Sequence, residues 1–181
     1  MKTISEEYRK EMQHLHENPS YGSSSIMFAP TVLQLINQIK PTTMTDYGAG
    51  KQRLNLRLQE LNSPKYKYQP FDPAFPEYGE AKEADLVCCI DVLEHIEPDL
   101  LHNFLEDLKR VTRRLGFFTI ATVPAKKKLS DGRNAHLIQK PQDWWVEMLA
   151  RYFDILEIQP APHGFVVVVT WLGQSQQSKK Q

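Results

Sequence analysis

The stretch from Thr43 to Gly50 constrains the fold of this chain more than any other part of it. Its sequence, TMTDYGAG, predicts a short buried strand that runs into a tight turn with glycines at positions 48 and 50. Helix-forming residues follow from Arg53 to Glu60. Glycine tolerates positive φ and has no Cβ, so a ligand can lie against the bare backbone of the turn. The N-terminus of the following helix directs its unpaired N–H groups to the same place. This order of elements predicts a ligand site.

Asp46 stands just before the first glycine. A carboxylate at this position would repel a phosphate group, so the turn is a poor cradle for a dinucleotide. It suits a ligand that carries an ammonium group or hydroxyl groups. This preference indicates S-adenosylmethionine, whose amino acid end and sulfonium are positively charged.

The size and charge of the chain exclude several classes of protein. Its 181 residues suit one domain with one sizeable core. Lys and Arg total 22 and Asp and Glu total 22, so no global field attracts nucleic acid or an anionic membrane. No apolar run approaches the roughly 20 residues that span a bilayer, and the polar N-terminus is no signal peptide. We therefore expect a soluble, cytoplasmic protein without a membrane partner. The neighbouring Cys88 and Cys89 are expected in the core rather than in a disulfide or metal pair.

Apolar periodicity and turn residues predict alternating helices and strands along the chain. Helices are expected over residues 5–17, about 29–40, about 51–62, 98–114 and 141–151, and strands over 43–47, 66–71, 84–90, 117–123, 152–158 and 165–171. Strands that alternate with helices indicate a parallel sheet between two helical layers, a three-layer α/β/α fold. The last two strands have no helix between them, so they must form an antiparallel hairpin. The last strand is apolar on both faces, which places it within the sheet.

Polar residues follow several of the expected strands. They are Asp46, Gly48 and Gly50 after the first strand, Asp72 after the second, Asp91, Glu94 and His95 after the third, and Pro124 after the fourth. In a sheet of this kind, ligands bind beyond the carboxyl ends of the strands. The polar residues therefore stand where a site is expected.

Three segments resemble the first, second and fourth motifs of the class I S-adenosylmethionine-dependent methyltransferases. They are Asp46-Tyr-Gly-Ala-Gly50, Asp72, and the run from Asp85 to His95. The resemblance covers roughly residues 20–172. It implies a Rossmann-like, doubly wound sheet, mostly parallel with one antiparallel strand near the C-terminus. The expected domains are 1–40 (N-terminal helices and a lid or simple linker), 41–173 (the methyltransferase core) and 174–181 (a disordered tail).

The resemblance implies a role for each matching residue. Gly48 and Gly50 would let the methionine part and the ribose approach the turn, Asp46 would bind the ammonium group, and Asp72 would hold the ribose hydroxyls. Asp91 would line the methyl-donor side. The other residues expected to contact the cofactor are Tyr47, Pro73, Phe75, Val92 and, in the lid, Tyr21.

The chain departs from the family pattern in one important place. Only a dozen residues separate Asp72 from the strand at Ala84, where a full family member fits a helix, a strand and another helix. We therefore expect a sheet truncated on one side, without the usual adenine-contacting segment. Phe71, Phe75 and Tyr78 are expected to shape the adenine pocket instead, by stacking. Gln52 occupies the third glycine position of the first motif, a change that the family tolerates.

The candidate catalytic residues are Asp91, Glu94, His95 and His136. Methyl transfer is an in-line displacement from an activated donor, so the protein supplies alignment and a base where the acceptor carries a proton. The same four residues also resemble the magnesium site of small-RNA 2′-O-methyltransferases and of some quinone O-methyltransferases. Two histidines suit manganese, iron or zinc better than magnesium. Without a metal, His95 acts as a base, or Glu94 and His95 orient the next segment.

These observations favour a methyltransferase that acts on a small molecule or on a polar hydroxyl or amine group. A metal-assisted 2′-O-methyltransferase of nucleic acid is the first alternative, which the neutral net charge disfavours. A cofactor-binding partner subunit without catalysis is the second. Lysines 126–128 either recognise an anionic group of the substrate or form a solvated loop. The remaining histidines are expected at exposed positions without a role: His14, His16, His102 and His163.

Overall fold

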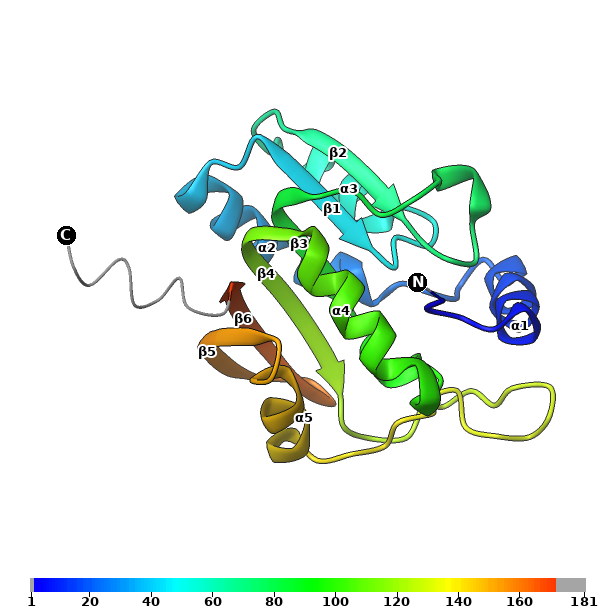
Figure 1. Ribbon diagram of the computed structural model, residues 1–181. Helices are drawn as coiled ribbons and strands as arrows, with labels where there is room; N and C mark the ends of the chain where they lie inside the picture. The colour runs from blue at the N-terminus through cyan, green and yellow to red at the C-terminus, as the bar shows by residue number, and fades with distance from the viewer. Residues whose placement is uncertain (1, 172–181) are drawn as a thin grey trace.

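The computed structural model describes residues 2–171, which form a six-stranded sheet with helices on both faces (Figure 1). The helices are α1 (Glu6–Glu17), α2 (Ser24–Ile39), α3 (Arg53–Glu60), α4 (Leu101–Val111) and α5 (Gln142–Leu149). The strands are β1 (Thr43–Tyr47), β2 (Lys67–Phe71), β3 (Ala84–Ile90), β4 (Thr112–Ala121), β5 (Phe153–Ala161) and β6 (Gly164–Trp171). Three short 3-10 helices complete the fold: η1 (Pro76–Tyr78), η2 (Leu93–His95) and η3 (Pro98–Leu100).

The strand order in the sheet is β2-β1-β3-β4-β6-β5. Strands β2, β1, β3 and β4 are parallel, whereas β6 is antiparallel to both of its neighbours, β4 and β5. This arrangement confirms the expected Rossmann-like sheet, including the insertion of the last strand between two others. It brings the carboxyl ends of β1 to β4 to one edge of the sheet.

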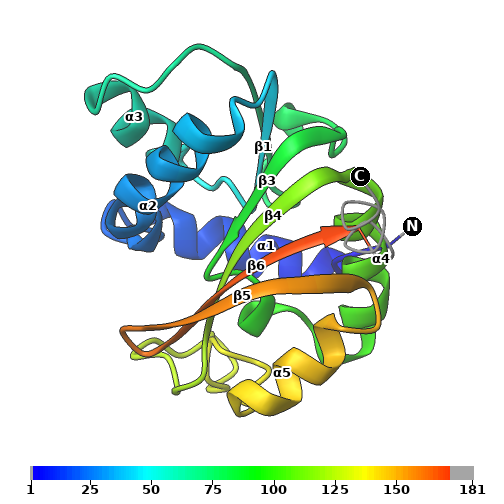
Figure 2. The same ribbon diagram turned by 90° about the vertical axis from the view of Figure 1, so that its left-hand side faces the viewer.

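Two hydrophobic layers cover the two faces of the sheet. Helices α4 and α5 lie on one side and α2 and α3 on the other (Figure 2). Consecutive residues of a strand point to opposite faces, so Phe118 packs in the first layer and Phe117 in the second. Likewise, Cys89 packs in the first layer and Cys88 in the second. Both cysteines are fully buried in the core, as expected, and both are free thiols.

Helix α4 ends earlier than its sequence suggests. Its apolar residues recur at the i, i+3, i+4 and i+7 spacing from Leu101 to Leu108, which gives one buried face. The helix was expected to continue to residue 114 and the next strand to begin at 117, but the extended backbone of Thr112 already begins β4. Thr112 Oγ1 donates a hydrogen bond to the Leu108 carbonyl at 2.8 Å, which satisfies an unpaired carbonyl at the helix end.

Helix α2 begins at Ser24, five residues before the expected start near residue 29. Pro30 therefore lies inside the helix, where it removes one backbone hydrogen bond. Phe28 and Ala29 are buried in the layer below α2, and this packing stabilises the first turns. The segment expected to be flexible is correspondingly shorter.

The hairpin of β5 and β6 is longer than predicted, because β5 runs to Ala161 and β6 starts at Gly164. A Cβ at Gly164 would lie 1.9 Å from the carbonyl oxygen of Ile120, so only glycine fits here. Backbone contact with β4 thus sets the end of the hairpin.

Strand β2 forms one edge of the sheet, which confirms the expected truncation. Residues 72–83 connect β2 to β3 with only the single turn η1 between them. Gln69 Nε2 donates to the carbonyl of Glu83 at 3.1 Å and ties this connection to β2. Within residues 2–171, no helix combines the length and the apolar character needed to cross a membrane. The expected disordered tail, 174–181, lies outside the described residues.

Candidate active site

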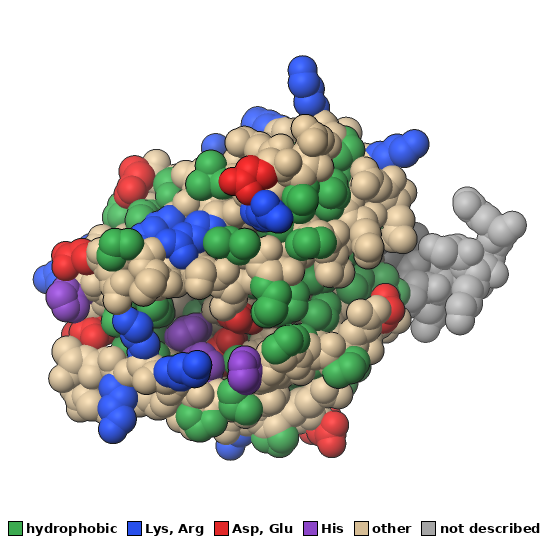
Figure 3. All heavy atoms as spheres, turned by 180° about the vertical axis from the view of Figure 1, so that it is seen from behind, with side chains coloured by type: hydrophobic (Ala, Val, Ile, Leu, Met, Phe, Trp, Pro, Cys, Tyr) green, Lys and Arg blue, Asp and Glu red, His purple; other side chains and the backbone are tan. Residues whose placement is uncertain are grey.

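A cavity of about 590 Å³ lies at the carboxyl ends of the parallel strands. In the face opposite to that of Figure 1, histidine and acidic side chains gather in a hollow flanked by Lys and Arg (Figure 3). Most of the residues expected in the site line the cavity together: Tyr21, Asp46, Gly48, Gly50, Asp72, Pro73, Asp91, Val92, His95 and His136.

The glycine turn has the geometry that its sequence indicates. Gly48 and Gly50 have φ values of +89° and +46°. A Cβ at Gly48 would lie 2.4 Å from Val92 Cγ2, so glycine is required both for the backbone and for the close packing. The N–H groups of Gly48 and Ala49 donate to the carbonyl of Phe71 at 2.7 and 3.0 Å. These bonds fix the turn to the end of β2.

Two buried carboxyl groups face the cavity. Asp46 accepts a hydrogen bond from the Tyr68 hydroxyl at 2.8 Å. Burial raises the pKa of Asp46 to about 7, against the lowering effect of that bond. Asp72 accepts from the backbone N–H groups of Gly50 at 2.9 Å and Ala74 at 2.8 Å. Burial raises the pKa of Asp72, and the two N–H groups oppose the shift. Both carboxyl groups are therefore held in fixed orientations.

The side chain of Tyr47 points away from the cavity into the core. It is fully buried, and its hydroxyl donates to Asp107 Oδ2 at 2.6 Å. Its ring packs against Phe71 and Phe104, with centroids 4.6 and 5.0 Å away. Tyr47 is therefore not among the residues that line the cavity, because residues 46 and 47 of β1 face opposite sides of the sheet.

The aromatic residues expected around adenine do not line the cavity. Phe75 and Tyr78 stack on each other with centroids 5.4 Å apart and ring planes 9° apart. Tyr78 also donates its hydroxyl hydrogen to the Gly50 carbonyl at 2.8 Å. These two residues thus support the glycine turn and its surroundings from outside the cavity.

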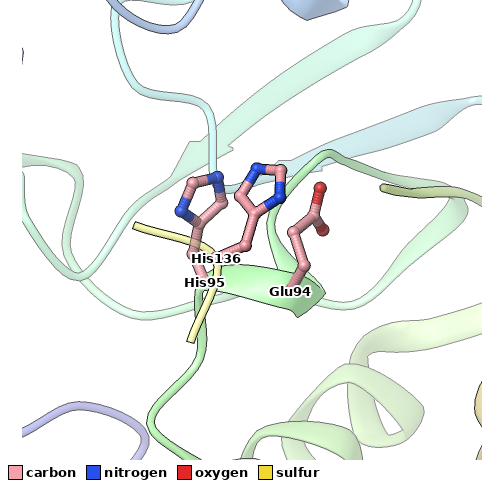
Figure 4. A group of neighbouring side chains, drawn as sticks. All are labelled: Glu94, His95 and His136. Atoms are coloured by element: carbon pink, nitrogen blue, oxygen red, sulfur yellow. The ribbon is translucent and has the colours of Figure 1, made fainter. Parts of the chain in front are cut away.

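Glu94, His95 and His136 form a cluster in which one potential ligand atom from each residue lies within 4.8 Å of the others (Figure 4). His95 Nδ1 lies 2.8 Å from the Ala135 carbonyl oxygen, and His136 Nδ1 lies 2.6 Å from that of Val123. A carbonyl oxygen only accepts, so each Nδ1 donates, and Nε2 is the nitrogen of each ring that is left for another partner. Glu94 Oε1 accepts from the Ala121 N–H at 3.0 Å, and Oε2 is buried without a hydrogen-bond partner in the described part of the chain.

The charge states of the cluster follow from its burial. Burial raises the pKa of Glu94 well above its ordinary value, and the nearby Asp91 raises it further. Burial lowers the pKa of His95 to about 4, with a smaller contribution from His136. His95 is therefore neutral at pH 7, and its Nε2 is able to accept a proton or to bind a cation.

Asp91, expected as the fourth member of this cluster, lies outside it. Its Oδ1 accepts a hydrogen bond from Thr119 Oγ1 at 2.5 Å, and its backbone has a positive φ of 51°. The unusual backbone conformation turns the carboxyl group toward β4 instead of toward the histidines. Asp91 still lines the cavity.

Comparison with solved structures identifies the fold. The chain superposes on 1,6-didemethyltoxoflavin-N1-methyltransferase of Burkholderia thailandensis, crystallised with its substrate and S-adenosylhomocysteine, with a TM-score of 0.65 at 16% identity. The match covers 94% of this chain and 92% of that one. The chain has the class I S-adenosylmethionine-dependent methyltransferase fold. No family model and no curated protein matches the sequence.

Other proteins with the methyltransferase fold extend beyond this chain. The mitomycin 7-O-methyltransferase matches with a TM-score of 0.63 at 13% identity, over 88% of this chain and 60% of that one. A small RNA methyltransferase matches with a TM-score of 0.57 at 15% identity, over 81% of this chain and 25% of that one. The chain thus spans less than two thirds of either protein.

The structure brings into the site residues that were left without a role from the sequence, among them His16. His16 of α1 was expected to be exposed, but its ring lines the cavity beside the glycine turn of the methyltransferase fold. The His16 ring contacts the rings of Tyr21 and Phe75, and each of the two ring centroids lies 5.0 Å from that of His16. Tyr8, Met12 and His16 follow each other at intervals of four residues, a helical stripe that would have placed His16 on the buried face.

Proposed function

We propose that this chain is an S-adenosylmethionine-dependent methyltransferase whose acceptor is a small molecule with a polar hydroxyl or amine group. The observation that carries the proposal is that the buried carboxyl groups of Asp46 and Asp72 face one cavity above the glycines of the turn. Such a pair suits a ligand with an ammonium group at one end and ribose hydroxyls further along.

The residues of the turn have separate tasks in binding the donor. Asp46, in its ionised form, attracts the ammonium group, and Tyr68 holds this carboxylate in place. Asp72 accepts hydrogen bonds from the ribose hydroxyls while its own position is fixed by Gly50 and Ala74. Gly48 and Gly50 leave room above the backbone. The donor, when bound, supplies a methyl group activated by its sulfonium sulfur.

The acceptor side of the cavity is formed by the segment after β4. Val123, Lys126, Lys127 and His136 line it from this side, and His163 lines it from the hairpin. Where no metal ion occupies them, the Nε2 atoms of His95 and His136 are positioned to take the proton that a hydroxyl or amine group loses on methylation. The backbone carbonyls that bind both Nδ1–H groups hold the rings in the orientation required for this step.

Three observations favour a small acceptor. The cavity measures about 590 Å³, a typical volume for a small-molecule site. Two structural neighbours are methyltransferases of small molecules, a toxoflavin precursor and mitomycin. The formal net charge of zero disfavours nucleic acid, whose binding depends on contacts with phosphates. A nucleic-acid hydroxyl remains the second acceptor to test, because a small RNA methyltransferase shares the fold.

We further propose that Glu94, His95 and His136 bind a divalent transition-metal ion. The donor set fits such an ion: two imidazoles present Nε2, each Nδ1–H is bound by a carbonyl, and Glu94 Oε2 is buried without a hydrogen-bond partner among residues 2–171. Hydrogen bonds to the distal ring nitrogen are typical of ligating histidines. Manganese, iron or zinc suits this set better than magnesium. The ion would lower the pKa of an acceptor hydroxyl.

The function is tested in two steps. Isothermal titration calorimetry with S-adenosylhomocysteine should show binding to the wild type and a loss of at least about tenfold in affinity for Asp72→Asn, since a charge-assisted hydrogen bond contributes about 1.5–3 kcal/mol. Incubation with isotope-labelled donor and a metabolite extract, followed by mass spectrometry, should then reveal a methylated product. Binding without any product would favour the non-catalytic partner subunit. An absence of binding would contradict the proposal.

A further inference from the structure

The ring of His16 is enclosed by parts of the chain that are far apart in sequence. A Cβ built at Gly50 would lie 2.9 Å from His16 Cε1, and one built at Gly22 would lie 3.5 Å from it. The rings of Tyr21 and Phe75 meet the imidazole edge to face from two further sides. The two glycines and the two aromatic rings thus surround the imidazole where it borders the cavity.

The polar atoms of His16 differ from those of the other histidines in the site. Within residues 2–171, its Nδ1 is buried and has no hydrogen-bond partner. His95 and His136, by contrast, each donate from Nδ1 to a carbonyl. Burial, together with the charges of Lys51 and Arg53, lowers the pKa of His16 to about 4. A buried ring nitrogen without a hydrogen-bond partner is unfavourable inside a protein, and a neutral imidazole that borders a cavity suits a ligand-binding role.

Two hydrogen bonds hold His16 over the glycine turn. Lys51 Nζ donates to the carbonyl of Asn18 at 2.6 Å, and the Arg53 guanidinium donates to the carbonyl of Pro19. The segment that leaves α1 is therefore attached to the residues that follow Gly50. The N–H of Gly50 itself donates to Asp72. His16 and Asp72 consequently flank the same glycine.

We propose that His16 binds the nucleoside half of the methyl donor through a hydrogen bond between its imidazole and a ribose hydroxyl. The inference rests on the proposed function, which places the ribose hydroxyls at Asp72. A hydroxyl group both donates and accepts, so a neutral imidazole is a suitable partner in either tautomer. The imidazole is supplied by the N-terminal helix α1. It gives the glycine turn an additional binding group, at a place where the sheet ends at β2 and offers no further strand.

The test compares two ligands and two variants. His16→Phe keeps a flat ring against Gly22, Gly50, Tyr21 and Phe75 but removes both nitrogens. Calorimetry should show roughly tenfold weaker binding of S-adenosylhomocysteine and of 5′-methylthioadenosine, which retains ribose and adenine but lacks the amino acid. His14→Ala is the matched control on the same helix, since the His14 side chain is 73% exposed and pairs with Glu17. It should bind both ligands as the wild type does.

Each other outcome has a definite meaning. Unchanged affinity of His16→Phe for both ligands would reduce His16 to a packing residue and overturn the inference. A loss confined to S-adenosylhomocysteine would move the contact to the amino acid half, which also overturns it. If His16→Phe lowers the midpoint temperature of unfolding, the second variant, His16→Gln, is measured, because it restores a polar group at this position. Recovery of affinity in His16→Gln supports the inference, and continued loss contradicts it. Failure of the wild type to bind either ligand would instead contradict the proposed function.

Discussion

The hydroxyl group of Tyr68 donates a hydrogen bond to Asp46 Oδ2 across the pair of parallel strands β2 and β1, at 2.8 Å. Asp46 lies opposite Pro70 in the register, and Tyr68, two residues earlier, shares the face of Pro70. The bond holds the buried carboxyl group toward the cavity. It also lowers the pKa of Asp46, although burial has the larger effect and raises it to about 7.

We expect the affinity for S-adenosylhomocysteine to rise as the pH increases from 6 to 8. With a pKa of about 7, Asp46 is mostly protonated at pH 6 and mostly ionised at pH 8, and only the ionised form attracts an ammonium group. Ionisation of one such group accounts for roughly a tenfold change. Calorimetry at both pH values measures it. Tyr68→Phe should move the midpoint to higher pH, and a pH dependence that persists unchanged in Asp46→Asn would contradict this explanation.

The same pKa shift makes a prediction for stability. The folded-state pKa of about 7 exceeds the ordinary value of 3.8, so Asp46 contributes stability that is fully present below about pH 4 and is lost as the pH rises through 7. Asp46→Asn has no charge to bury. We expect this variant to exceed the wild type in unfolding free energy at pH 8, by on the order of 1–4 kcal/mol, and to differ less at pH 4. Urea denaturation at the two pH values provides the comparison.

Tyr47→Phe separates a structural role from a binding role. The hydroxyl of Tyr47 donates to Asp107 in the core, on the side of the sheet away from the cavity. Its removal should lower the unfolding free energy by about 1–3 kcal/mol. The affinity for S-adenosylhomocysteine should stay unchanged in calorimetry. A selective loss of affinity at unchanged stability would instead support a contact between Tyr47 and the cofactor.

Gly48→Ala should damage both stability and donor binding. The new methyl group would lie 2.4 Å from Val92 Cγ2, at a backbone φ of +89° that disfavours alanine. We expect a loss of about 1–3 kcal/mol in unfolding free energy, measured by denaturation. Val92→Ala in the same chain removes the clash but not the backbone strain. A double-mutant cycle should therefore show partial recovery, and strictly additive losses would argue against the contact.

The sequence was sufficient to predict the layers, the strand order at the C-terminus and the gathering of polar residues at the strand ends. These features depend on local patterns: the apolar run of β3, the glycine turn, and the absence of a helix between β5 and β6. The first and last residues of the helices and strands were harder to predict from the sequence. The start of α2 and the start of β4 depend on burial of Phe28 and on the hydrogen bond from Thr112 to Leu108, which are contacts of the folded chain.

Side-chain direction explains the remaining differences within the site. The sequence placed Tyr47 next to Asp46, but consecutive strand residues face opposite ways. It grouped Asp91 with Glu94, but the left-handed backbone at Asp91 directs its carboxyl group to Thr119. His16 is distant in sequence from the glycine turn, and only the packing of α1 brings the two together.

The three-residue cluster makes a prediction about metals. Calorimetry with Mn²⁺ or Zn²⁺ should show one site in the wild type. His136→Ala removes one of three ligands and should weaken the affinity at least about tenfold. His14→Ala, which changes an exposed histidine, should bind the metal as the wild type does. Absence of heat with either ion, or equal affinity of His136→Ala, would remove the metal from the proposed mechanism.

Cys88 and Cys89 occupy adjacent positions of β3, yet their thiols belong to different layers of the molecule. Burial raises the pKa of both thiols well above the ordinary range, which suppresses the reactive thiolate form. A thiol reagent therefore reaches either sulfur only when the centre of the sheet opens. The rate at which a thiol reagent labels Cys88 or Cys89 therefore reports how often the helical layer on that side of β3 detaches from the sheet.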